Sequence, residues 1–353
     1  MRALRVYGKD GFRIEDIPEP QPGPGEVKLE VHFCGICGSD VHDYVEGPRL
    51  LPVGRPHPQT GRIAPITYGH EFSAEVVEVG PGVQGIQTGA RVVVRPTMPC
   101  YRCRYCIEGR AIQCTQLAAV GGAADGAYAR FAVVRADCVL PLPASVSWET
   151  GAYAEPLACG VRAVRRSRLE PGAVAAVIGA GPIGLLTMQM ALACGAREVH
   201  VFETARVRRE LALKLGASSV LDPREGDPGR VIGKLTGGQR VDVAFECAGT
   251  GPALQLADQV SGRGATIVQV GVQREPVTFD FFSLFFREKT IVTSQGYSNP
   301  EFEIAVGLLG AGRIKPHPVM TSAIIPLEEV ITGGIEALLG PQRESHCKIL
   351  VAP

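Results

Sequence analysis

The stretch VAAVIGAGPIG, residues 174–184, decides the fold of the central part of the chain. Its apolar first half suits a buried strand, Gly179, Gly181 and Gly184 form a GxGxxG turn, and an apolar helix follows. Such a turn lets the backbone approach a pyrophosphate, whose charge the helix N-terminus faces. Glu203 stands 19 residues beyond Gly184, at the end of the next expected strand, where a carboxylate accepts hydrogen bonds from ribose hydroxyls and repels a 2′-phosphate. The sequence therefore predicts a Rossmann domain that prefers NAD to NADP.

Three further residues are assigned to the same cofactor site. Pro182 and Ile183 lie inside the turn, and Arg208 follows Glu203 by five residues. Arg206 and Arg208 reduce the expected preference for NAD, because a guanidinium favours a 2′-phosphate. An ordinary strand–helix turn is the alternative interpretation of the glycine pattern.

Apolar strands and helices alternate from about residue 170 to residue 295. A helix is expected over residues 205–215, followed by Gly216 as a C-terminal cap. This alternation predicts βαβ units around a parallel sheet, and therefore an α/β fold. The expected strands cover residues 174–178, 199–202, 241–245 and 266–270.

The first 155 residues follow a different pattern. Short valine-rich runs separated by glycine and proline indicate a mostly β domain. After about Gly296 the strand–helix alternation fades. The clearest runs in the first part are residues 26–32, 75–79 and 90–94.

Four cysteines crowd into 15 residues, with two-residue gaps between the first three. Four thiolates can close a tetrahedral zinc site that has no open position, which makes such a site structural. The alternatives are unrelated buried cysteines and a zinc ribbon that binds nucleic acid. The four residues are Cys100, Cys103, Cys106 and Cys114.

A second set of possible metal ligands is spread along the chain. Cys37 begins the segment CGSDVH, His70 and Glu71 follow a glycine, and Glu155 precedes a proline. These residue types bind zinc, and a catalytic zinc keeps one position open for water or substrate. Because these residues are far apart in the sequence, an alternative interpretation remains open, in which the histidine is a buried structural residue and the acids lie on the surface.

Composition excludes several classes of protein. The chain has 353 residues, with 36 Lys and Arg against 36 Asp and Glu, and this balance argues against a nucleic-acid partner. The N-terminus lacks the apolar core of a signal peptide, and we expect a cytoplasmic protein. Residues 173–196 carry no charge, but their glycines and proline favour a strand, turn and helix over a membrane span.

Several motifs occur in the order of a known family. They are CGICGSDVH, GHEFSAEVVEVG, the four-cysteine segment, AEPLACG and GAGPIG. Together they resemble the zinc-dependent medium-chain dehydrogenase/reductases over nearly the whole chain, most closely the polyol and R-specific 2,3-butanediol dehydrogenases. The segment HPQTG at residues 57–61 is similar to one in the butanediol group.

The resemblance implies a GroES-like β-rich catalytic domain over residues 1–155. This domain is followed by a Rossmann domain over residues 156–295. Residues 296–353 then return to the catalytic domain. It also implies two Zn²⁺ per chain, NAD as cofactor, and a homodimer or homotetramer without a membrane or nucleic-acid partner.

The same resemblance assigns roles to residues of the catalytic domain. Cys37 and His70 become zinc ligands, and Glu71 or Glu155 completes the set. Classical relatives use a second cysteine near the position of Glu155, which leaves the choice of glutamate open. Ser39 and His42 resemble the proton relay of the family. The usual DGGFAEY is DGAYARF here, at residues 125–131.

The expected reaction transfers a hydride between a secondary alcohol and NAD. The substrate class is a vicinal diol such as 2,3-butanediol, or a polyol. A dehydrogenase of the sorbitol or L-threonine type, a zinc-independent quinone reductase and a non-catalytic zinc- and nucleotide-binding protein are the alternatives. A relay beside Cys37 argues against the last, because a protein that only binds needs none.

Overall fold

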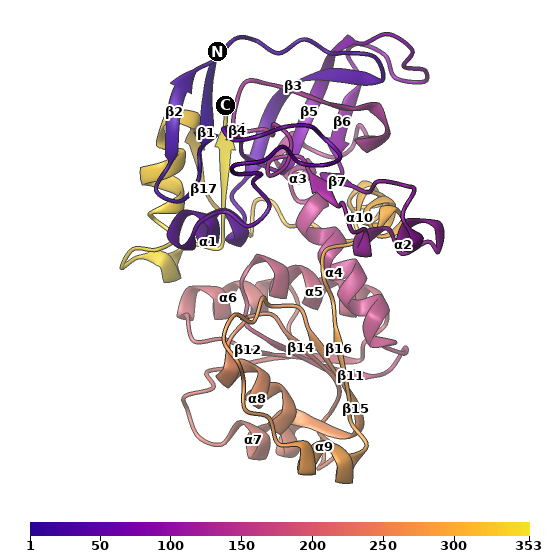
Figure 1. The fold of residues 1–353 in the computed structure, drawn as a ribbon. Coiled ribbons are helices and arrows are strands. Elements are labelled where there is room, and N and C mark those ends of the chain that lie inside the picture. The colour runs from indigo at the N-terminus through magenta and orange to yellow at the C-terminus, as the bar shows by residue number, and fades with distance from the viewer. The chain divides into compact units, whose positions relative to one another are not determined.

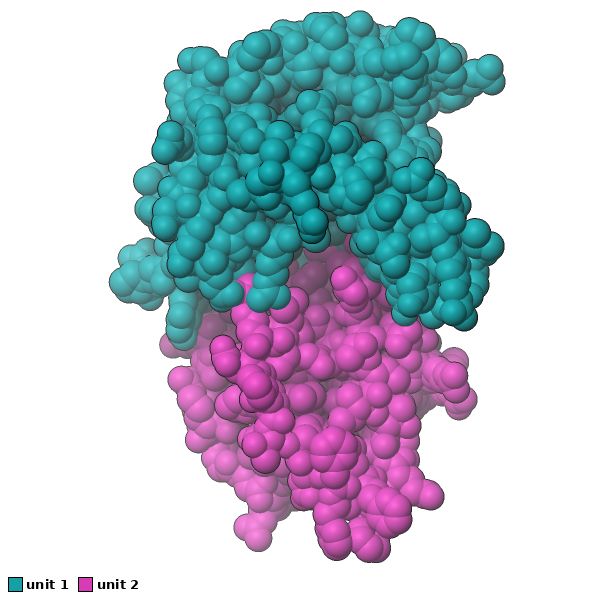
Figure 2. All heavy atoms as spheres, viewed as in Figure 1, with its two compact units in different colours: residues 1–155, 298–353 teal, residues 156–297 magenta.

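The computed structural model describes residues 1–353, which divide into two compact units (Figures 1 and 2). Unit 1 consists of Met1–Glu155 and Ser298–Pro353, and unit 2 of Pro156–Tyr297. The chain therefore leaves unit 1 once and returns to it. Each unit has its own sheet and its own apolar core.

Unit 2 contains one six-stranded sheet whose paired strands are all parallel. Its order, β13-β12-β11-β14-β15-β16, reverses direction between β11 and β14, which is the doubly wound arrangement expected. All residues of β11 are buried, as in a central parallel strand covered on both faces. The strands are β11 (Val174–Ile178), β12 (Glu198–Phe202), β13 (Ser219–Leu221), β14 (Val241–Glu246), β15 (Ser261–Gln269) and β16 (Thr290–Thr293).

The expected strands and helix of unit 2 are present with small shifts of their ends. The helix expected at 205–215 runs from Arg206 to Lys214. β15 begins at Ser261 instead of 266, because Gly262 and Gly264 in its first half resemble a turn in the sequence. The helices are α5 (Pro182–Ala193), α6 (Arg206–Lys214), α7 (Pro228–Leu235), α8 (Gly251–Val260) and α9 (Phe281–Arg287).

Unit 1 is β-rich, as expected, and its largest sheet has seven strands. The long strand β3 pairs with β5, β9 and β18, all antiparallel. β18 comes from the end of the chain, so the last residues complete the sheet that the first residues begin. The strands of this sheet are β3 (Glu26–Gly35), β5 (Glu71–Val79), β6 (Arg91–Val94), β9 (Phe131–Arg135), β10 (Val139–Pro141), β17 (Thr321–Pro326) and β18 (Lys348–Ala352).

Two smaller sheets, five α-helices and several short 3₁₀- and π-helical turns make up the rest of the regular structure in and next to unit 1. One three-stranded sheet has the order β2-β1-β4, and β7 pairs with β8. Helix α4 crosses the boundary between the units. The strands are β1 (Arg2–Val6), β2 (Phe12–Asp16), β4 (Ile66–Thr67), β7 (Thr97–Met98) and β8 (Ala118–Ala119), and the helices are α1 (Gly38–Glu46), α2 (Arg104–Ile107), α3 (Trp148–Gly151), α4 (Ala154–Ser167) and α10 (Asn299–Gly310).

The uncharged segment 173–196 forms β11, the glycine turn and α5. None of the helices has both the length and the apolar character that crossing a bilayer requires.

Candidate active site and metal centres

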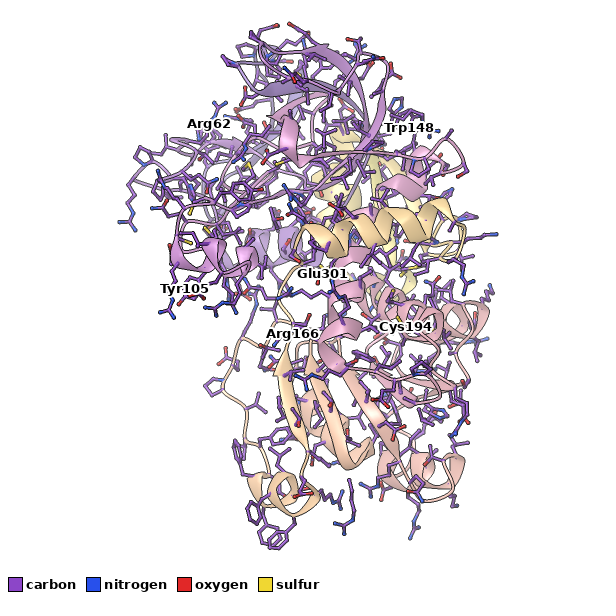
Figure 3. All side chains as sticks on the ribbon, turned by 90° about the vertical axis from the view of Figure 1, so that its right-hand side faces the viewer. Arg62, Tyr105, Trp148, Arg166, Cys194 and Glu301 are labelled. Carbon is purple, nitrogen blue, oxygen red and sulfur yellow. The ribbon has the colours of Figure 1, made fainter.

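The four clustered cysteines come together at one point of unit 1. Cys103 precedes α2 and Cys106 lies within it, while Cys100 and Cys114 flank the segment. Their sulfurs all lie within 4.8 Å of one another, and the Sγ atoms of Cys103 and Cys106 are 3.5 Å apart. Four Zn–S bonds of about 2.3 Å in a tetrahedron place the sulfurs about 3.8 Å apart. The cluster therefore fits a structural zinc, and sulfur atoms gather beside Tyr105 in Figure 3.

Backbone amides support the thiolate form of this cluster. The N–H of Cys100 donates to the sulfur of Cys114 at 3.3 Å, and the N–H of Cys103 donates to the sulfur of Cys100 at 3.4 Å. Gln116 donates its N–H to Cys114 as well, at 3.3 Å. Backbone N–H donors at Cys106 and Thr115 lower the pKa of Cys103. Burial raises the pKa of Cys106 and Cys114, so the backbone donors favour the thiolate, which is the zinc-binding form of cysteine, at Cys100 and Cys103.

A second group of candidate metal ligands lies where β3 ends and β5 begins. The antiparallel pairing sets Gly35 opposite Glu71, so the residues that follow β3 meet the residues that start β5. Cys37 lies just before α1, and His70 immediately precedes β5. The ligand atoms of Cys37, His70 and Glu71 lie within 4.8 Å of one another. Strand pairing thus brings together candidates that are far apart in the sequence.

Glu71 also takes part in a buried ion pair. Its Oε2 accepts a hydrogen bond from Nζ of Lys348 at 2.6 Å, and Lys348 donates to the carbonyl of Ile36 at 2.9 Å. The side chains of both charged residues are almost fully buried. A Cβ at Gly35 would lie 2.3 Å from Oε2 of Glu71, so glycine is required for the carboxylate to fit. Glu71 can therefore serve the metal, the lysine or both.

Asp40 lies in the first turn of α1 and is a neighbour of His70. Its Oδ2 accepts hydrogen bonds from the N–H of Cys37 at 3.0 Å and from the hydroxyl of Tyr128 at 2.7 Å. Its Oδ1 lies 3.7 Å from Nδ1 of His70. Asp40 therefore caps α1 and also faces the ring of a metal-ligand candidate, which is how carboxylates orient ligating histidines.

The charge around His70 suits a dication. Burial lowers the pKa of this imidazole, but Cys37, Asp40 and Glu155 raise it well above its ordinary value. The site thus concentrates anionic groups where a bound zinc would neutralise them. Glu155, half-buried in α4, acts on His70 electrostatically but lies outside the group of three whose ligand atoms meet.

The candidate relay residues lie on α1, directly after Cys37. Ser39 and His42 are three positions apart and therefore share one face of the helix. Both are exposed, in contrast to Asp40 between them, which is buried. A hydroxyl and an imidazole on the accessible face of this helix can exchange protons with water.

The glycine turn of unit 2 has the geometry that dinucleotide binding requires. Gly179 has φ +93°, and a Cβ at Gly184 would lie 1.9 Å from the carbonyl oxygen of Gly179. A Cβ at Gly181 would meet no atom within 4 Å, which leaves that side of the turn open to a ligand. Pro182 is the first residue of α5, followed by Ile183, so the N-terminus of a 12-residue helix points out of the turn.

Glu203 connects the turn to the end of β12. Its Oε2 accepts the N–H of Ala180 at 2.7 Å, and its Oε1 accepts the N–H of Ala205 at 2.8 Å. The carboxylate is thus fixed beside the glycines, where the sequence places it. Arg208 is half-buried on α6, whereas Arg206 is exposed and bonded to Glu210 at 2.9 Å.

Sequence reasoning missed three residues of the zinc-ligand region. Tyr128 and Lys348 carry no signal in the sequence, because each reaches the site from a distant segment. Asp40 has a weak signal, since it is an acid three residues after Cys37 in the same motif.

Comparisons with known proteins agree with this arrangement. Residues 23–144 match the alcohol dehydrogenase GroES-like domain and residues 182–311 match the zinc-binding dehydrogenase family. The (R,R)-butanediol dehydrogenase of Bacillus subtilis strain 168 is 37% identical, with 100% of both chains covered. A sorbitol dehydrogenase of Halalkalibacterium halodurans is 33% identical over 91% of this chain and 92% of its own.

Solved structures give the same result. The crystal structure of 2R,3R-butanediol dehydrogenase from Bacillus subtilis superimposes with a TM-score of 0.93 at 36% identity, covering 100% of this chain and 99% of the other. A zinc-binding dehydrogenase of Sinorhizobium meliloti 1021 bound to NADP gives a TM-score of 0.90 at 32% identity, with the same coverage. The expected GroES-like and Rossmann folds are confirmed.

Proposed function

Because this chain belongs to the zinc-dependent medium-chain dehydrogenase/reductase family, we propose that it oxidises one hydroxyl of a vicinal diol such as 2,3-butanediol, with NAD as hydride acceptor. The broader activity, zinc-dependent oxidation of secondary alcohols or polyols, follows from family membership. The meeting of Cys37, His70 and Glu71 in unit 1 carries the proposal for the reacting centre. The full-length similarity to butanediol dehydrogenases supports the choice of a diol.

The residues at the end of β3 and the start of β5 would hold the catalytic zinc. We assign Cys37 and His70 as ligands and Glu71 as the nearer of the two glutamate candidates, with Glu155 as the alternative. When bound, zinc supplies Lewis acidity that makes an alcohol hydroxyl acidic near neutral pH. Asp40 would orient the imidazole of His70, and Lys348 would hold Glu71.

The proton lost by the alcohol would leave along the accessible face of α1. Ser39 would accept it while passing its own hydroxyl proton on toward His42, and His42 would release a proton to water. Imidazole suits this last step because its ordinary pKa lies near neutrality. Both residues are exposed on one helix face, which supports the assignment.

The carboxyl edge of the sheet in unit 2 would bind the dinucleotide. The N-terminus of α5 would face the pyrophosphate, and Glu203 would accept the ribose hydroxyls and repel a 2′-phosphate. Since a relative binds NADP, the ratio of kcat/KM for NAD and NADP is the direct test of this cofactor assignment. A ratio near one would contradict it.

We further propose that the chain forms a homodimer or homotetramer through α9 and β16. The four phenylalanines of α9, Phe281, Phe282, Phe285 and Phe286, are 58–76% exposed. β16 is an edge strand of its sheet. Four such rings expose roughly 500 Å² of apolar surface, near the upper limit for a monomer. Sedimentation of the chain and of a Phe282→Asp, Phe285→Asp variant tests this: the wild type should be oligomeric and the variant should dissociate.

We also propose that the protein is located in the cytoplasm.

Steady-state NADH formation with a panel of alcohols tests the function. The panel contains the stereoisomers of 2,3-butanediol, sorbitol, L-threonine and a primary alcohol, and Cys37→Ala serves as the inactive control. A vicinal diol should give the highest kcat/KM. A higher kcat/KM for sorbitol or L-threonine would identify the chain as a dehydrogenase of that type instead. Binding of zinc and NAD without turnover would indicate a non-catalytic binding protein.

A further inference from the structure

Two arginines and one aspartate lie where the strands β12 and β13 end. The N–H of Glu203 donates to the carbonyl of Leu221 at 3.0 Å, so the residues that follow the two strands are neighbours. Asp222 comes directly after β13 and is buried. This group therefore adjoins Glu203, the carboxylate assigned to the ribose.

Asp222 binds both arginines at once. Its Oδ2 accepts hydrogen bonds from Arg209 at 2.8 Å and from Nη2 of Arg224 at 2.6 Å. Its Oδ1 accepts from Nε of Arg224 at 2.9 Å, which makes that pair bidentate. Charge-assisted bidentate pairs of this kind are among the stronger hydrogen bonds in proteins.

The same guanidiniums hold the backbone at the end of β12. Arg209 donates to the carbonyls of Glu203 at 2.9 Å and Thr204 at 2.7 Å, and Arg224 donates to the carbonyl of Thr204 at 3.0 Å. Two positive side chains are thus anchored beside Glu203, the carboxylate that we assign to the adenosine ribose. One buried carboxylate offsets their charge.

We propose that Asp222 is a specificity-determining residue: by engaging Arg209 and Arg224 it denies a 2′-phosphate the cationic site that these arginines would otherwise form. The inference rests on the proposed binding of NAD at this edge of the sheet. It adds to the repulsion by Glu203 a second barrier against NADP, one that acts by neutralising cations instead of placing an anion.

This assignment differs from the one suggested by the sequence alone. Arg206 is bonded to Glu210 on the exposed face of α6, whereas Arg209 and Arg224 donate to the backbone at Glu203 and Thr204. Arg209 and Arg224 therefore join Arg208 as arginines that can meet a phosphate. One of them follows β13 and lies outside the glycine-turn motif.

Equilibrium binding of NAD and NADP by isothermal titration calorimetry tests the proposal. Asp222→Asn should strengthen NADP binding relative to NAD by about 10- to 100-fold, the range of a hydrogen bond to a charged group. Adding Arg224→Ala to that variant should cancel the gain. Asp227→Asn is the matched control, because it removes a nearby exposed carboxylate that caps α7 and should leave the ratio unchanged.

The outcomes separate the inference from the function on which it rests. An unchanged NADP-to-NAD ratio in a folded Asp222→Asn protein would overturn the role of Asp222 while leaving NAD binding intact. Arg224→Ala in the wild-type background gives an independent check, since weaker NADP binding there would show that Asp222 does not silence Arg224. A wild-type protein that binds neither dinucleotide would overturn both proposals.

Discussion

Replacing Lys348 with methionine should strongly destabilise unit 1. The ammonium group of Lys348 is 2.6 Å from the carboxylate of Glu71, and the two side chains are only 3% and 1% exposed. Methionine fills similar space but removes the ammonium group that neutralises the buried carboxylate of Glu71.

Removing one partner of a buried ion pair costs about 3–5 kcal/mol. Unit 1 has about 210 residues, and in domains of that size 1 kcal/mol shifts the melting temperature by about 2–4 °C. The melting temperature of unit 1 should therefore fall by at least about 6 °C. Burial lowers the pKa of Lys348, but Glu71 and Cys37 raise it above its ordinary value. The stabilisation is thus fully present at neutral pH and is lost only as the pH rises through that raised pKa.

Differential scanning calorimetry at neutral pH measures the effect. Lys28→Met is the matched control, because Lys28 is also buried but pairs with Glu19, whose side chain is about half exposed. Glu19 can turn to water when its partner is removed, so the loss should be about 1 kcal/mol or less. Equal melting temperatures for Lys348→Met and the wild type would refute the reasoning, because they would mean that Glu71 does not need Lys348 as its counter-ion.

Three other predictions follow from the sites. Elemental analysis should find two zinc ions per chain, and a chelator should abolish activity before the protein unfolds, because only the site at Cys37 keeps an exchangeable position; one zinc or none would contradict this. His42→Ala should slow alcohol oxidation at neutral pH by up to about 10²–10⁴-fold, with the zinc content intact and part of the rate restored by added imidazole. Cys37→Ala should instead lose zinc, and imidazole should not restore its activity. An unchanged pH–rate profile in His42→Ala would remove His42 from the relay. Arg224 and Arg209 hold the pKa of Asp222 well below its ordinary range, so Asp222→Asn should lower the melting temperature at pH 7. The difference in melting temperature from the wild type should shrink as the pH falls below about 4. A difference that does not vary with pH would show that the charge of Asp222 adds no stability.

Local features of unit 2 could be predicted because their physical causes are local. The strand at 174–178 is a run of apolar residues, and the turn after it depends on glycines within six positions. Hydrogen bonds between backbone neighbours and the burial of apolar side chains determine such elements, and both leave a local pattern in the sequence. Where that pattern is interrupted, as by Gly262 and Gly264 near the start of β15, the predicted first residue of the strand is wrong.

The metal sites show the same division between local and long-range information. The four cysteines from Cys100 to Cys114 lie within 15 residues, so a short loop can gather them and their spacing alone points to zinc. Cys37 and His70 are 33 residues apart, and only the family resemblance pairs them in the sequence. Their meeting depends on the antiparallel register that sets Gly35 opposite Glu71.

The sequence by itself determined the Rossmann turn, the four-cysteine cluster and the family, because each motif that carries them consists of residues close together in the chain. Only the tertiary structure decided what surrounds the reacting residues. Lys348 reaches Glu71 across 277 positions because β18 joins the sheet beside β3, and Tyr128 reaches Asp40 across 88. Contacts of this kind arise from the pairing of distant strands, which optimises the burial of the whole sheet and leaves no spacing that a single sequence can show.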